Sequence, residues 1–158
     1  MSKYQNIDDE GNSFEAPMVE GFPMEDTFED FAGNDRIFLI HCHRLPTGFA
    51  LEAIEKDTDE QAYAFSAWSE TSYGAGLVDL RVKIRRMLAT RHITKKDRGI
   101  VMLHDTIRGR IGYDSLKGLV LYVDGQAVSI PDLCNILETH EGFQFKLVIA
   151  DPSEDIPR

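Results

Sequence analysis

The sequence predicts an α+β fold, a mainly antiparallel β-sheet with two α-helices on one face and an acidic N-terminal arm. Most of the chain shows short segments in which apolar and polar residues alternate, with turn residues between them. Two other segments place apolar residues three and four positions apart, which is typical of amphipathic helices. The chain has 158 residues and 42% apolar content, which suits a soluble domain with a real core.

The N-terminal arm is expected over residues 1–35 and is largely irregular. It holds ten acidic residues and one lysine, a composition that cannot form a core alone. Met24, Phe28 and Phe31 fall at positions i, i+4 and i+7, so one short amphipathic helix can form there if a partner accepts its apolar face. These three residues are therefore candidate partner-binding residues.

A single α+β domain is expected over residues 36–151, followed by a C-terminal tail at 152–158. Its first part predicts three antiparallel strands, at residues 37–43, 49–56 and 63–69, with a turn at Pro46-Thr47-Gly48. An amphipathic helix between Gly76 and His92 follows, because Leu77, Leu80, Ile84 and Leu88 recur at helical spacing.

The second part predicts short strands at 100–104 and 107–113 and a central strand at 119–123, which is apolar on both faces. Asp124-Gly125 predicts a hairpin, and Ser129 with Asp132 predicts the capping box of a second helix that ends at Gly142. Alternation of Phe143, Phe145, Leu147 and Ile149 with polar residues predicts a final strand.

Three motifs occur in order in this second part: Arg108-Gly109-Arg110-Ile111 with Asp114, then Val123-Asp124-Gly125, then the stretch from Glu141 to Leu147. In these motifs, and in Tyr113 before the acid, the chain resembles a family of small bacterial proteins of unknown function. The resemblance covers about two thirds of the chain and excludes residues 1–35. At Ile130-Pro131-Asp132 the chain departs from the tryptophan and acids of that family. The family has no assigned activity, so the resemblance implies no catalytic residue.

The basic residues are concentrated in residues 79–117, which hold eleven basic and four acidic residues although the whole chain has a net charge of −10. Arg81, Arg85, Arg108 and Arg110 are candidate anion-binding residues, since guanidinium groups suit phosphate or carboxylate. Nucleic acid is a conceivable partner, but no nucleic-acid-binding motif or phosphate-binding glycine loop is present.

His41 and His43 are candidate metal ligands. Residues two apart on a strand share a face, so both imidazoles could bind one zinc ion, with further ligands from His92, His104 or His140 and their neighbours. The alternative is a half-buried strand whose histidines bond locally. Cys42 lies on the opposite face with Phe38 and Ile40, which indicates a small core residue and not a nucleophile. No cofactor is expected, zinc being the exception.

These patterns favour a small non-enzymatic interaction or regulatory module, with a protein partner or self-association, in which the acidic arm docks on a basic surface. The alternatives are a metal-dependent enzyme using His41 and His43, and an anion or nucleic-acid binder using residues 79–117. Two scattered cysteines and the lack of a signal peptide predict the cytoplasm, and the apolar runs are too short for a membrane partner.

Overall fold

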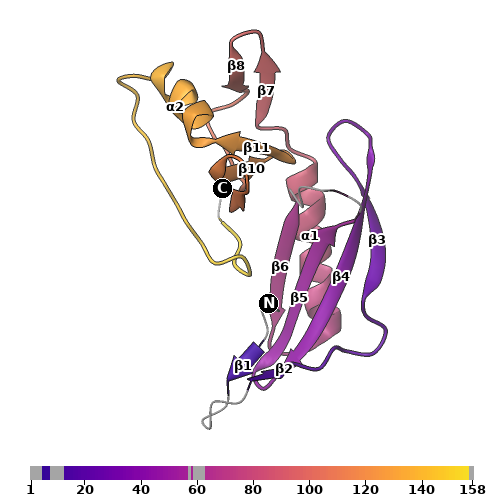
Figure 1. The fold of residues 1–158 in the computed structure, drawn as a ribbon. Helices are drawn as coiled ribbons and strands as arrows, with labels where there is room; N and C mark the ends of the chain where they lie inside the picture. Colours follow the sequence, from indigo (N-terminus) through magenta and orange to yellow (C-terminus); the bar gives the residue numbers. More distant parts are fainter. Residues whose placement is uncertain (1–4, 8–12, 57, 59–62, 157–158) are drawn as a thin grey trace.

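The computed structural model describes residues 5–7, 13–56, 58 and 63–156, and Figure 1 shows their arrangement. In chain order the elements are β1 (Gln5–Ile7), β2 (Ser13–Glu15), β3 (Met24–Glu29), β4 (Asp35–Leu45), β5 (Gly48–Glu55), β6 (Ala64–Ser69), α1 (Tyr73–Leu88), β7 (Ile93–Lys96), β8 (Gly99–Met102), β9 (Arg110–Asp114), β10 (Gly118–Val123), β11 (Gln126–Ser129) and α2 (Ile130–Glu138). The predicted α+β class is confirmed. No helix of the described residues is long and apolar enough to cross a bilayer.

The N-terminal half is a four-stranded antiparallel sheet, in the order β3-β4-β5-β6, with α1 along one face (Figure 1). Alternate residues of β4, among them Phe38, Ile40 and Cys42, have no exposed surface and form a core with Leu80 and Ile84 of α1. This is the arrangement that period-2 strands and a period-3.6 helix produce when their apolar sides meet. The predicted meander and first helix are confirmed.

Residues 24–29 form an edge strand, and the short helix expected from Met24, Phe28 and Phe31 is wrong. Met24 pairs with Ile40 and Glu29 with Asp35, so the segment extends the sheet beyond β4. Spacing of four residues fits one face of a strand as well as one face of a helix. Because an isolated helix of six residues is marginal in water, the open edge of β4 decides the outcome.

The C-terminal half contains a β7–β8 hairpin, a three-stranded antiparallel sheet in the order β11-β10-β9, and α2. The predicted central position of residues 119–123 is confirmed. Asp124 and Gly125 have φ values of 51° and 74°, as a two-residue type I′ hairpin requires. The capping box between Ser129 and Asp132 begins α2 as expected. Ile93, Val123, Val128 and Ile136 form a separate core here.

Two expectations about this half differ from the structure. The helices do not share one face of one sheet, because α1 contacts β3, β5 and β6 whereas α2 contacts β8, β10 and β11. Residues 143–149 form no strand, since their backbone pairs with none of the described strands. The single domain expected over residues 36–151 stays a prediction, and the buried residues form separate clusters before and after residue 90.

Asp124 joins the two halves at the link that follows α1. Its Oδ2 accepts hydrogen bonds from the backbone amides of His92 at 2.7 Å and Ile93 at 2.8 Å. The ring of Tyr63 lies against Gly125, where an added Cβ would come within 2.8 Å of Tyr63 Cε2. The hairpin that the sequence predicted locally therefore also makes a contact between the two halves.

Candidate functional site

The β11-β10-β9 sheet is covered at one end only. Directly opposite residues of neighbouring strands lie on the same face, and the register aligns Val128 with Leu121 and Leu121 with Ile111. At the β11 end, Val128 is buried in a cluster with Ile136 of α2. At the β9 end of the same face, the side chains of Ile111 and Tyr113 are 52% and 76% exposed. This sheet therefore ends in an uncovered apolar surface at β9.

Residues 143–149, called the apolar segment below, form the second part of the site. They run extended after α2, and Phe145 and Leu147 are 89% and 75% exposed. Residues 144–150 make no backbone–backbone hydrogen bond with another described residue. The alternation that predicted a strand is therefore present without a neighbouring strand. Large apolar patches of this kind are uncommon on monomeric proteins and mark interaction surfaces.

Both ends of the apolar segment are held by other parts of the chain. Gly142, at φ 85°, lies between α2 and the segment. After the segment, Lys83 Nζ of α1 donates to the carbonyl oxygens of Pro152 at 2.7 Å and Glu154 at 2.9 Å. Arg86 forms an ion pair with Asp155. The segment thus spans from α2 to α1, and Figure 1 shows it, in yellow, running apart from β10 and β11.

Lys83 is a structural contact in this arrangement. Its ammonium group donates to three carbonyl oxygens, since Ser66 of β6 accepts a third hydrogen bond at 3.1 Å. Burial lowers the pKa of Lys83, and the negative charge of Asp155 offsets part of this shift. A pocket of about 250 Å³ lies beside this lysine, between α1, β6 and the C-terminal tail. Because its donors are satisfied by carbonyls, Lys83 holds the tail to α1 and is not placed as a proton acceptor.

The four candidate anion-binding arginines serve separate contacts. Arg81 Nε lies 2.6 Å from Asp26 of β3, and Arg85 lies over the ring of Phe28, 5.6 Å from its centroid. In the other half, Arg108 donates to the carbonyl of Ile156 at 3.0 Å, and Arg110 lies over Tyr122. Asp26 and Phe28, in the N-terminal part of the chain, therefore contact α1, as Asp155 near the C-terminus does. Anion or nucleic-acid binding by these arginines stays a prediction.

His41 and His43 share one face of β4, as predicted. His43 Nδ1 lies 3.0 Å from the carbonyl oxygen of Ala16, a local contact. Within the described part of the chain, no group of three or more histidine, cysteine or acidic side chains is placed to hold a metal ion. Zinc sites use at least three protein ligands. The described residues supply no third ligand, so metal binding by the two histidines stays a prediction.

Cys42, between the two histidines, is a core residue. It is fully buried, and burial raises the pKa of its thiol to about 11. A thiol with such a pKa is protonated at neutral pH and is a poor nucleophile.

The candidate partner-binding residues of the arm contact the protein itself. Phe28 is 4% exposed and packs edge-on against Phe38, and Met24 packs at the margin of the same core. Phe31 lies beneath the guanidinium of Arg91. Phe28 therefore contributes to the core instead of offering its side chain to a partner.

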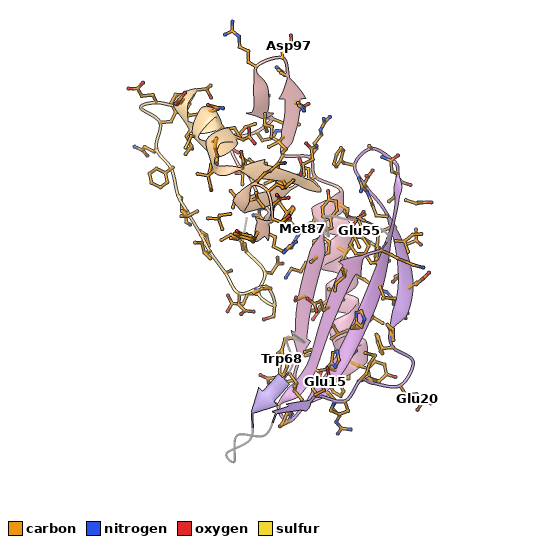
Figure 2. The ribbon with its side chains drawn as sticks, viewed as in Figure 1. Glu15, Glu20, Glu55, Trp68, Met87 and Asp97 are labelled. Carbon is orange, nitrogen blue, oxygen red and sulfur yellow. The ribbon has the colours of Figure 1, made fainter. Side chains whose placement is uncertain are left out.

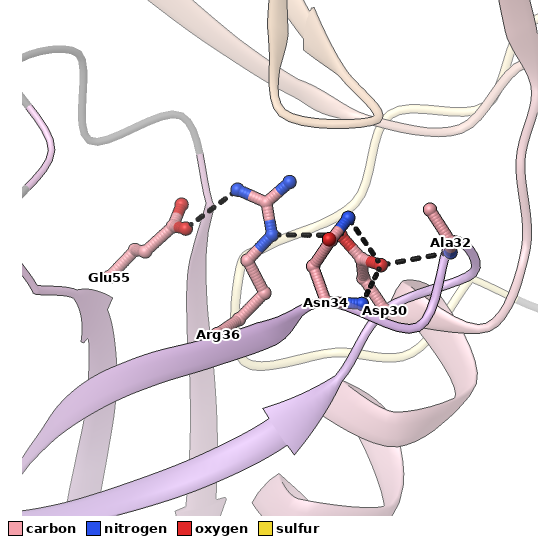
Figure 3. A network of polar contacts seen from close by, with 5 residues as sticks. All are labelled: Asp30, Ala32, Asn34, Arg36 and Glu55. Carbon is pink, nitrogen blue, oxygen red and sulfur yellow. Dashed lines mark hydrogen bonds and ion pairs between the residues drawn. The ribbon is translucent and has the colours of Figure 1, made fainter.

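A buried polar network at the β3–β4 loop was not found by sequence reasoning (Figure 3). Asp30 accepts hydrogen bonds from the backbone amides of Ala32 at 2.8 Å and Asn34 at 3.0 Å, and from Arg36 Nε at 2.9 Å. Arg36 also contacts Glu55 at 2.9 Å. Burial raises the pKa of Asp30, but these hydrogen bonds outweigh it and lower the pKa to about 2. Asp30 followed by Gly33-Asn34 is a local turn signal, whereas Glu55 enters only through the sheet register.

Two family models match the chain, one on each half. Residues 92–154 match a domain of unknown function (DUF7713), and residues 20–89 match a second domain of unknown function (DUF7686). The expected similarity to proteins without an assigned activity is confirmed, and the three motifs that indicated it all lie within residues 92–154. The matches meet at the link between α1 and β7. No curated protein and no solved structure matches the chain.

Proposed function

We propose that this protein is a non-enzymatic interaction module that binds a protein partner through the apolar surface of its C-terminal half. The observation that carries the proposal is the apolar segment, an extended stretch with Phe145 and Leu147 largely in solvent. Burying a large apolar side chain contributes roughly 1.5–3 kcal/mol, so covering both residues would supply about 3–6 kcal/mol towards binding, and pairing of the backbone and burial of the neighbouring apolar residues would supply the rest.

The form of the segment favours a protein over a small molecule or a nucleic acid. Among the described residues, no backbone–backbone hydrogen bond reaches residues 144–150, and the side chains of the segment alternate; this is the arrangement used when an extended peptide adds to the edge of a sheet. The segment from 143 to 149 carries one charge, that of Lys146. Binding of a polyanion would instead require several cations along the contact.

Photo-crosslinking in the cells that make the protein tests this proposal without knowledge of the partner. A photoreactive phenylalanine analogue replaces Phe145 in the full chain, and in a control chain it replaces Asp97 at the tip of the β7–β8 hairpin, which points away from the rest of the protein (Figure 2). We expect a crosslinked polypeptide at position 145 and none at position 97. Equal yields at the two positions, or no crosslink at position 145, would contradict the proposal.

A further inference from the structure

We propose that the partner is a second copy of this chain: the apolar segment of each copy adds as a fourth strand to the side of β9 that pairs with no described strand in the other. The inference rests on the proposed function and names its partner. Two features of the same chain support it: neither the backbone of the apolar segment nor the outer side of β9 pairs with a described strand.

The segment is already in the conformation of a strand. The chain runs elongated here (Figure 1), its apolar side chains occupy alternate positions from Phe143 to Ile149, and the backbone of residues 144–150 has no ladder partner among the described residues. An exposed apolar strand of this kind is a template for pairing with another chain. Pairing would satisfy its backbone groups and bury one row of its side chains together.

The edge of β9 presents apolar side chains that match those of the segment. β9 pairs with β10 on one side and with no described strand on the other. Its apolar face exposes Ile111 and Tyr113, so an added strand with Phe145 and Leu147 on that face would continue the sheet and cover both. The β3 edge instead carries Glu25, Asp26 and Glu29, and acidic residues discourage strand addition. At the opposite edge, β11 packs against α2.

The segment of the same chain pairs with none of the described strands, β9 included. It is bounded by α2 on one side and by the contacts of Lys83 and Arg86 with the tail on the other. Pairing within one chain would require these contacts to break. Two chains related by a twofold axis satisfy both segments and both edges at once, which is the usual symmetry of a homodimer. Between Glu141 and Asp151 the segment carries no acid, so it adds no negative charge of its own to the contact.

Sedimentation velocity of the full chain tests the inference. We expect a dimer at about 100 μM, a concentration at which a micromolar dimer is formed. Phe145→Asp should raise the dissociation constant at least about tenfold, because a charge replaces a buried apolar side chain. Gln144→Asp is the matched control: it adds the same charge at the neighbouring position, which faces the other side of the strand, and should change the constant less than about threefold.

Complementation identifies the β9 edge and the second copy. Tyr113→Asp damages the edge and leaves the segment intact, whereas Phe145→Asp does the reverse. An equimolar mixture of the two variants retains one intact junction, so it should form dimers that neither variant forms alone. If Tyr113→Asp does not fold, as circular dichroism would show, the comparison of Phe145→Asp with Gln144→Asp decides the matter.

Hydrogen exchange separates the ways in which the inference can fail. A wild-type monomer at about 100 μM overturns the self-association. If the amides of residues 144–149 are then protected, the segment pairs within its own chain. If they are unprotected while position 145 crosslinks to a different protein, the proposed function stands and only the identity of the partner is wrong. If neither a dimer nor a crosslink is found, both proposals fail.

Discussion

Asp30 provides the sharpest test of what holds the N-terminal half together. Its side chain is 1% exposed and accepts hydrogen bonds from two backbone amides of the β3–β4 loop, from the side-chain amide of Asn34 and from Arg36. Asp30→Asn keeps the size of the side chain but removes its charge and one of its two acceptor oxygens. The loop amides and Arg36 then compete for a single acceptor.

The expected loss is about 2 kcal/mol of unfolding free energy at pH 7. Hydrogen bonds to charged groups contribute roughly 1.5–3 kcal/mol each, and the shift of the pKa from 3.8 to about 2 corresponds to about 2 kcal/mol by linkage. Because the pKa of Asp30 is lower in the folded protein, its contribution is fully present above about pH 4 and is lost as the pH falls towards 2. At pH 3 about half of it should remain.

Urea denaturation followed by the fluorescence of Trp68, the one tryptophan of the chain, measures this loss at pH 7 and pH 3. Asp35→Asn is the control, since it makes the same change of charge at an exposed residue of the same hairpin. It should cost less than about 0.5 kcal/mol. Equal midpoints for the two variants at pH 7, or a difference between Asp30→Asn and wild type that does not shrink at pH 3, would refute this account of the network.

Two further substitutions test the packing of each helix. Gly76→Ala should destabilise the protein by about 1–3 kcal/mol, because a Cβ there would lie 2.5 Å from Leu51 Cδ1. Gly74→Ala in the same helix is the control: its Cβ would meet nothing closer than 3.9 Å, so it should be neutral or stabilising. Similar melting temperatures for the two variants in thermal unfolding would contradict the close approach of α1 to β5. Ser129→Ala should lower the free energy of unfolding by about 1 kcal/mol, because the capping box is lost. Ser115→Ala, in an exposed turn, is the control, and equal unfolding midpoints for the two variants would show that the cap adds no stability.

The elements that sequence reasoning placed correctly are those whose signals are local. The Asp124-Gly125 turn needs positive φ at two adjacent residues, and the start of α2 needs an acceptor for the backbone amide of Asp132, which the Ser129 hydroxyl three residues earlier provides; both requirements are met within the segment that carries them. The alternation of β4 and β5 likewise shows which side chains face a core. None of these inferences depends on which distant residue fills the other side of the contact.

The errors arose where the outcome depends on a distant partner. Residues 24–29 carry a spacing that fits a helix or a strand, and the edge of β4 selects the strand. The apolar segment has the pattern of a strand, but a pattern cannot supply the neighbour that would make it one. The four candidate arginines form two pairs in the sequence, and strand pairing and the tail bring them to Asp26, Phe28, Ile156 and Tyr122; anion binding by them stays a prediction.

The sequence by itself determined the fold class, the positions of most strands and both helices, the Ser129 cap, the Asp124-Gly125 turn, and the similarity to proteins without an assigned activity. Only the tertiary structure decided that Asp30, Arg36 and Glu55 form one buried network, that acidic ends of the chain contact α1, and that a strand-like segment is left without a neighbour. The physical reason is that the two kinds of interaction act over different distances along the chain. Backbone preference acts over a few residues, whereas the contacts that define a site join residues brought together by sheet register and chain topology.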